Sequence, residues 1–277
     1  MPDLWMLFPD GKSKALTLSY DDGVEQDIRL IEILNRYGLK ATFNISSGLY
    51  APEGHKWPEG QIHRRMPRSK ALELYADCGH EIAIHATHHG NLPSLPAAHA
   101  VWQVIRDKEN LENDFGRIIR GMAYPFGAVT AEFAETLKSC GIAYSRSVES
   151  THRFSIPHDW LRLPATCHHD DPRLMELAEQ FVSPYPFGPQ LFYLWGHSYE
   201  FEAHDNWHVI ENFARFMSGR EEIWYATNIE IYDYVTAWRG MHISADGRRF
   251  HNPSAQSLWL LADGKVRKIE AGGDLVL

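Results

Sequence analysis

The sequence has few cysteines, no long apolar run and no excess of positive charge. Its three cysteines, Cys78, Cys140 and Cys167, are far apart and show no paired metal-binding spacing. An odd count without a disulfide framework fits a reducing compartment. No stretch approaches the roughly 20 apolar residues of a transmembrane helix, and the amino terminus has no basic region followed by an apolar core. We therefore expect a cytoplasmic protein without a membrane partner.

The charge balance argues against a nucleic-acid partner. The 277 residues include 27 Lys and Arg against 36 Asp and Glu, which gives a net charge of -9. Because no basic stripe is present, we expect no nucleic-acid partner. The β-rich tail and the 12% of aromatic residues permit a homo-oligomer but do not require one.

Apolar strand patterns and helical patterns alternate up to residue 240. Strands are expected at 15–20, 41–46, 80–85, 121–127, 142–148, 190–197 and 223–228, and helices at 24–37, 69–78, 96–115, 130–140, 173–181, 205–217 and 229–238. The stretches 47–67 and 149–172 are expected to be irregular. This alternation predicts an α/β fold, a barrel of about seven parallel strands. We divide the chain into a barrel at 1–240 and a small antiparallel β extension at 241–277.

Two adjacent carboxylates, Asp21 and Asp22, come at the end of the first expected strand. Successive side chains of a strand point to opposite sides, so one carboxylate can bind a metal while the other handles a proton. A surface turn would give the same Asp-Asp-Gly sequence.

Histidines come at the ends of two further strands. His85 and His89 follow the third strand, and a spacing of four on a helical turn brings two imidazoles close enough to share a metal. His88 competes for the same role, and a solvated polar loop is the alternative. His197 ends the strand 191–197, where a hydrogen-bonded core histidine is the alternative. All these strand ends meet at the face where such barrels place active sites.

Together the motifs resemble the polysaccharide deacetylases with a NodB-like domain, carbohydrate esterase family four. The resemblance covers residues 14 to 240 in the family's order. Its four matches are Ser19-Tyr20-Asp21-Asp22-Gly23, His85-Ala86-Thr87-His88-His89, in part Ala123-Tyr124-Pro125-Phe126-Gly127, and Leu194-Trp195-Gly196-His197.

The resemblance implies a distorted (β/α) barrel with one divalent metal ion. It makes Asp22, His85 and His89 the ligands, Asp21 the general base and His197 the general acid. It also assigns the backbone amide of Phe126 to the oxyanion. The ion is expected to be zinc, with nickel, cobalt, manganese or iron as alternatives, since all tolerate this ligand set. Five residues are candidates for substrate contact: Tyr20, Tyr124, Pro125, Phe126 and Trp160.

The sequence departs from the family's motifs at two positions. Ala86 stands where the family has Ser or Thr, and Ala123 stands where an arginine usually orients the basic aspartate. Arg146, on the next expected strand, is our candidate replacement, and Arg162 is the second. A surface salt bridge is the alternative for Arg146.

Two further segments near residue 160 carry polar residues. Asp159-Trp160 is a loose match to a fourth family motif. The run His168-His169-Asp170-Asp171 can line the substrate cleft, bind a second ion or form a polar loop.

The resulting function is metal-dependent removal of acetyl groups from an acetylated carbohydrate, with an N-acetyl sugar preferred. Hydrolysis of another C–N bond, such as that of a cyclic amide or imide, is an alternative on the same fold. A second alternative is a catalytically dead barrel that only binds carbohydrate. A non-haem iron oxygenase also uses two histidines and one carboxylate, but its usual β-rich scaffold conflicts with the βα alternation.

Overall fold

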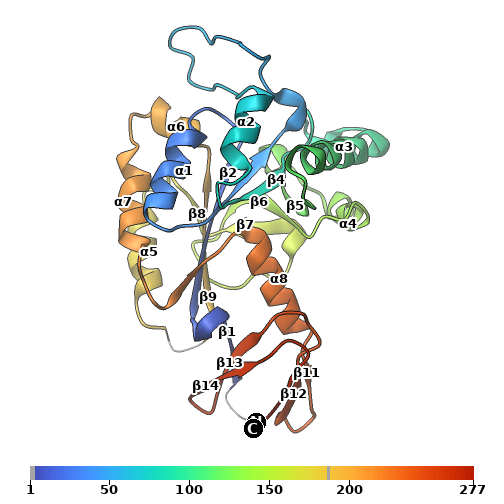
Figure 1. Ribbon diagram of the computed structural model, residues 1–277, viewed down its shortest axis with the longest axis vertical. Helices are drawn as coiled ribbons and strands as arrows, with labels where there is room; N and C mark the ends of the chain where they lie inside the picture. Colours follow the sequence, from blue (N-terminus) through green and yellow to red (C-terminus); the bar gives the residue numbers. More distant parts are fainter. Residues whose placement is uncertain (1–3, 186–187) are drawn as a thin grey trace.

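A sheet of parallel strands forms the centre of the protein, whose computed structural model describes residues 4–185 and 188–277 (Figure 1). Within these residues the strand order is β7-β6-β5-β4-β3-β2-β9-β8, and β10 pairs with β2. The strands are β2 (Lys14–Asp21), β3 (Ala41–Ile45), β4 (Glu81–Ile84), β5 (Gly121–Ala123), β6 (Tyr144–Ser150), β7 (Leu163–Ala165), β8 (Cys167–His168), β9 (Gln190–Gly196) and β10 (Ile223–Tyr225). The predicted distorted barrel of about seven parallel strands is confirmed.

The segment 163–168 connects the two ends of this strand order. Its first half, β7, pairs with β6, and its second half, β8, pairs with β9. Between them, the Thr166 amide donates to the Tyr193 carbonyl at 2.8 Å. The expectation that 149–172 is irregular is therefore wrong here: short strands with Pro164 and polar neighbours lack the long apolar run that marks a buried strand.

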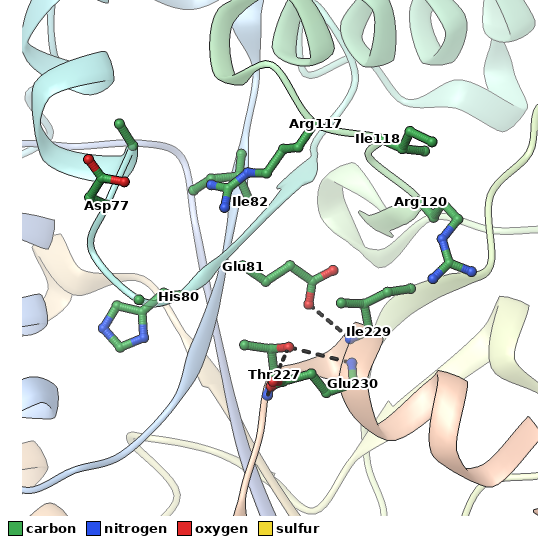
Figure 2. A pocket seen from close by; sticks show the side chains of 12 residues that line it. Asp77, His80, Glu81, Ile82, Arg117, Ile118, Arg120, Thr227, Ile229 and Glu230 are labelled. Atoms are coloured by element: carbon green, nitrogen blue, oxygen red, sulfur yellow. Dashed lines mark hydrogen bonds between the residues drawn. The ribbon is translucent and has the colours of Figure 1, made fainter. Parts of the chain in front are cut away.

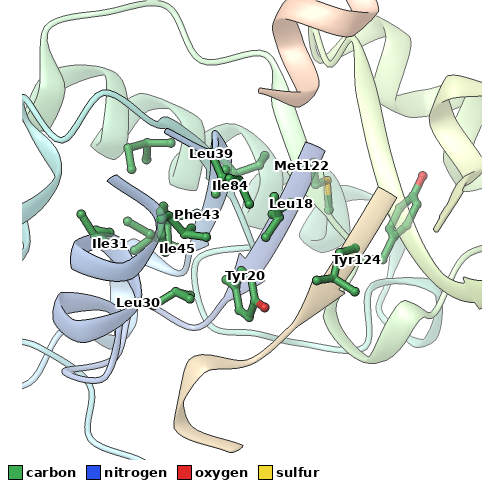
Figure 3. Close-up of a cluster of buried hydrophobic side chains, with 14 of the residues drawn as sticks. Leu18, Tyr20, Leu30, Ile31, Leu39, Phe43, Ile45, Ile84, Met122 and Tyr124 are labelled. Carbon is green, nitrogen blue, oxygen red and sulfur yellow. The ribbon is translucent and has the colours of Figure 1, made fainter. Parts of the chain in front are cut away.

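Helices pack on the outside of the sheet. They are α1 (Asp27–Arg36), α2 (Arg68–Tyr75), α3 (Ala97–Phe115), α4 (Ala131–Ser139), α5 (Leu174–Val182), α6 (Ser198–Ala203), α7 (His208–Met217) and α8 (Asn228–Arg239). In α1, Leu30 and Ile31 come from its apolar stripe and pack near Phe43 of β3 (Figure 3). The expected single helix at 205–217 is wrong at its start, since the segment begins with a turn and α7 starts only at His208.

Short antiparallel strands lie at the far end of α8 (Figure 1). One sheet has the order β1-β13-β14 and another the order β11-β12-β15. The strands are β1 (Leu4–Leu7), β11 (His242–Ile243), β12 (Arg249–His251), β13 (Leu258–Ala262), β14 (Lys265–Ile269) and β15 (Asp274–Val276). The amino-terminal strand β1 pairs with β13 of the C-terminal extension, although we had assigned residues 1–240 to the barrel. The division at residue 240 stays a prediction.

The amino ends of the strands hold a pocket of about 500 Å³ (Figure 2). Glu81, at the start of β4, accepts from the Ile229 amide at 2.9 Å and from the Thr42 and Tyr144 hydroxyls at 2.8 Å each. Its burial raises the pKa of Glu81 to about 7. These contacts join α8 to the sheet, a structural role. Among the described residues, no helix is long and apolar enough to cross a membrane.

Candidate active site

Asp21 is the last residue of β2 and is buried. The Arg146 guanidinium, from β6, contacts its Oδ2, and Asn44 Nδ2 donates to its Oδ1 at 2.8 Å. Burial by itself would raise the pKa of Asp21, but Arg146, together with His85 and His197, outweighs it and holds this pKa below its usual value. The carboxylate is therefore ionised and fixed in orientation from both of its oxygens.

Arg146 reaches Asp21 because of the register between β5 and β6. Ala123 and Arg146 are directly paired across these strands, so their side chains leave the same face of the sheet. The Trp195 ring lies under the guanidinium, 4.3 Å from its central carbon to the ring centroid. The structure thus places an arginine one strand away from the position where the family motif has it. Arg162, the second candidate, is exposed and pairs with Asp159 at 2.7 Å.

Asp22, His85 and His89 each offer a ligand atom, and these atoms lie within 4.8 Å of one another. His85 Nδ1 lies 2.8 Å from the Ala123 carbonyl, which can only accept, so this nitrogen carries the proton and Nε2 keeps a free lone pair. Burial lowers the pKa of His85, and it lowers the pKa of His89 to about 4. Two neutral imidazoles and one ionised carboxylate fit a divalent ion.

The backbone that presents these ligands is not the helical turn that the sequence suggested. Ala86 and His89 both have left-handed φ angles, 60° and 51°, so the prediction of a helical turn is wrong. The two rings still meet, with centroids 4.7 Å apart. His88 turns away, and its ring stacks on Trp102 with centroids 6.0 Å apart. This excludes His88 from the ligand group in this structure.

The loop between β3 and α2 supplies two residues that sequence reasoning missed. Arg65 donates to Asp22 Oδ1 and to the Asp22 carbonyl, at 2.7 Å each. His63 Nε2 lies 3.2 Å from Asp22 Oδ2. The only available signal was the length and polarity of the loop itself, which projects at the end of the molecule opposite the C-terminal strands (Figure 1).

His197 follows β9, and its Nε2 lies 3.9 Å from Asp21 Oδ2. On its other side, Nδ1 lies 3.3 Å from Glu200 Oε1, and Glu200 Oε2 accepts from the His197 amide at 3.1 Å. Burial lowers the pKa of His197, but Glu200 and Asp21 outweigh burial and raise it above its ordinary value. The protonated form that an acid needs is therefore favoured. Glu200 was missed, although its spacing of three after His197 is a helix-start signal.

The five predicted substrate contacts lie in different surroundings. The Tyr20 side chain is fully buried and stacks on His169, and the Tyr124 hydroxyl donates to the Leu161 carbonyl at 2.7 Å. Pro125 is buried as well. These three predictions are therefore wrong as direct contacts, because buried side chains cannot reach a sugar. Phe126 is 66% exposed and its ring lies 4.6 Å from that of His89, which leaves it available.

Trp160 is the fifth, and its substrate contact stays a prediction because the residue is partly buried. Its ring packs against Tyr232 of α8, with centroids 5.3 Å apart, and Arg239 lies over it. The residue joins the apolar cluster between the barrel and the C-terminal strands. Asp159 caps the following turn through the amides of Leu161 and Arg162.

The fold is that of the polysaccharide deacetylases. A family described as polysaccharide deacetylase matches residues 9–145, and over that stretch the chain belongs to it. No protein of curated function matches the sequence.

Solved structures share the fold at low identity. One is a Mycobacterium smegmatis protein provisionally classed as a polysaccharide deacetylase: 16% identity, TM-score 0.59, covering 86% of this chain and 96% of that chain. A family 4 carbohydrate esterase from Streptomyces lividans, solved with acetate, has 16% identity and a TM-score of 0.50 over 76% of this chain and 91% of that one. A family 4 pseudoenzyme from Bacillus anthracis has 17% identity and a TM-score of 0.49, over 83% and 68%.

Proposed function

We propose that the protein is a metal-dependent deacetylase that removes the acetyl group from an N-acetylated sugar. The observation that carries this proposal is the placement of Asp21. It lies beside the Asp22, His85 and His89 group, with Arg146 on one oxygen and His197 3.9 Å away. Family membership supports deacetylation of carbohydrate, and the site geometry supports the metal.

Amide hydrolysis needs a base for water, a partner for the oxyanion and an acid for the leaving amine. When bound by Asp22, His85 and His89, a divalent ion supplies Lewis acidity, lowering the pKa of water from 15.7 towards about 7 and polarising a carbonyl. Asp21 takes the proton of the attacking water, because Arg146 keeps this carboxylate ionised. His197 gives its proton to the amine, because Glu200 and Asp21 favour its charged form. The Phe126 amide is the oxyanion donor that the family motif assigns.

Acetate release from N-acetyl- and O-acetyl-sugars by the zinc-loaded protein tests the proposal. We expect release from an N-acetyl sugar, abolished in Asp21→Asn and in Asp22→Ala, with only the second variant losing the zinc ion of the Asp22, His85 and His89 group. Arg162→Ala, an exposed site, serves as the control and should retain activity.

Other outcomes would reassign the function. Ring opening of a cyclic amide or imide without acetate release would move the substrate to another C–N bond. A zinc-loaded protein that binds acetylated sugar and turns over none of these compounds would be a binding barrel. Either result refutes the deacetylase.

A further inference from the structure

A second group of possible metal ligands lies next to His197, between the end of β8 and the start of α6. Its members are His168, His169, Asp170 and Glu200, whose ligand atoms lie within 4.8 Å of one another. His169 Nε2 is 3.3 Å from Glu200 Oε2 and 3.4 Å from Asp170 Oδ1. One imidazole nitrogen thus faces two carboxylates from two different elements.

The His169 ring is packed between aromatic rings and lacks hydrogen-bond partners among the described residues. The side chain is fully buried, and neither ring nitrogen has a hydrogen-bond partner within residues 4–185 and 188–277. Phe201 and Tyr20 stack on the ring, with centroids 4.1 and 5.8 Å away. Gly196 makes room for it, since a Cβ at that position would lie 2.0 Å from His169 Nδ1. A buried polar ring without hydrogen bonds is costly and needs a compensating interaction.

The spacing of these atoms fits a metal ion. Metal–ligand bonds of about 2.0–2.2 Å in a tetrahedral site place neighbouring ligand atoms roughly 3.3–3.6 Å apart. The two separations around His169 Nε2, 3.3 and 3.4 Å, match that range. We propose that His169, Asp170 and Glu200 hold a second divalent transition-metal ion, distinct from the one assigned to Asp22, His85 and His89.

His168 stands outside this ligand set because of its protonation. Its Nδ1 accepts the Asp170 amide at 3.1 Å, so in the neutral ring Nε2 carries the proton. That nitrogen lies 3.2 Å from Glu200 Oε2 and donates to it. His168 therefore orients the ligating carboxylate, as outer partners of metal sites commonly do.

His169, Asp170 and His204 also line a surface pocket of about 620 Å³. Water can complete the coordination from there. One imidazole with two carboxylates favours zinc, iron or manganese over magnesium, which prefers oxygen ligands. Bound there, the ion joins the β8 end to the start of α6 and fixes Glu200, which in turn contacts His197. This second site would position His197 through Glu200, and its ion would not contact the reacting atoms of the substrate.

Zinc stoichiometry of the full chain, stripped with a chelator, reloaded and dialysed, tests this second site. We expect two ions per wild-type chain, one in Asp22→Ala, one in Asp170→Asn and none in the double variant. Asp171→Asn, the same change one residue further on, should keep two, because Asp171 pairs with His152 instead.

An Asp170→Asn variant that binds as much zinc as wild type would overturn the inference. A failure of the first site is distinguishable, because it would leave the stoichiometry unchanged in Asp22→Ala. Zinc-edge anomalous scattering from wild-type crystals gives a readout that needs no variant. We expect a peak beside His169 Nε2. If zinc-loaded crystals show a peak at the Asp22, His85 and His89 group but none beside His169, the second site is refuted.

Discussion

Arg146→Ala should remove the charge that keeps Asp21 ionised. Both side chains are buried, so the change leaves a buried carboxylate without its partner. Breaking a buried ion pair in this way costs about 3–5 kcal/mol of unfolding free energy. Because the pKa of Asp21 is held below its unfolded value, this stabilisation is present above about pH 3.9 and is lost as the pH falls through the folded pKa. Urea unfolding at pH 7 and near pH 3 measures the difference.

The same change should reduce activity through the base. A positioned general base contributes about 10²–10⁴-fold, so we expect kcat to fall by at least about 10²-fold. Without the guanidinium the pKa of Asp21 rises, and the acid limb of the kcat/KM profile moves to higher pH. Arg162→Ala, whose guanidinium is exposed and pairs with Asp159, should leave the profile in place.

Arg146→Ala combined with Ala123→Arg makes the test sharper. Positions 123 and 146 are register partners on one sheet face, so an arginine at 123 can enter the space that Arg146 vacates. We expect the double variant to recover part of the lost activity and to return the acid limb towards lower pH. A single variant with the wild-type kcat and acid limb would refute the role of Arg146. A double variant no more active than Arg146→Ala would refute the inference that an arginine at position 123 can reach Asp21 from the same sheet face.

Three further changes probe other parts of the site. Glu200→Gln removes the carboxylate that raises the pKa of His197, so the alkaline limb of kcat/KM should move to lower pH; an unchanged limb would contradict this assignment. Phe126→Ala removes an exposed ring beside the site, and KM should rise about 2–10-fold with little change in kcat or zinc content, as steady-state kinetics and metal analysis would show. Trp160→Phe should lower the unfolding free energy by about 1–2 kcal/mol and leave KM unchanged; a raised KM would instead support the substrate contact of Trp160.

The sequence predicted the barrel and its central group because these depend on local patterns. A β-prone run ending in Asp21 and a strand followed directly by His197 place these residues at one edge of a parallel sheet. Arg146, which contacts Asp21 in the structure, was predicted as a replacement from its place on the adjacent strand. The contacts of Asn44 and Arg65 with the two carboxylates were missed, because pairings between distant segments leave no periodic signal in a single sequence. The contact of Glu200 with His197 is local, three residues apart, and was missed although that spacing marks a helix start.

The wrong prediction of a helical turn between His85 and His89 has a physical cause, which also explains how the site is built. Strand alternation holds only while the backbone stays extended, and at the strand ends it does not: Asp22, His89 and Phe126 all have left-handed φ angles, 86°, 51° and 60°. For residues other than glycine this conformation costs roughly 1–2 kcal/mol each, so the surrounding structure must impose it. Arg65 binds both the carbonyl and the carboxylate of Asp22 and thus fixes one of these turns. The left-handed turns bring Asp22 and His89 towards His85, and no sequence period can encode that convergence.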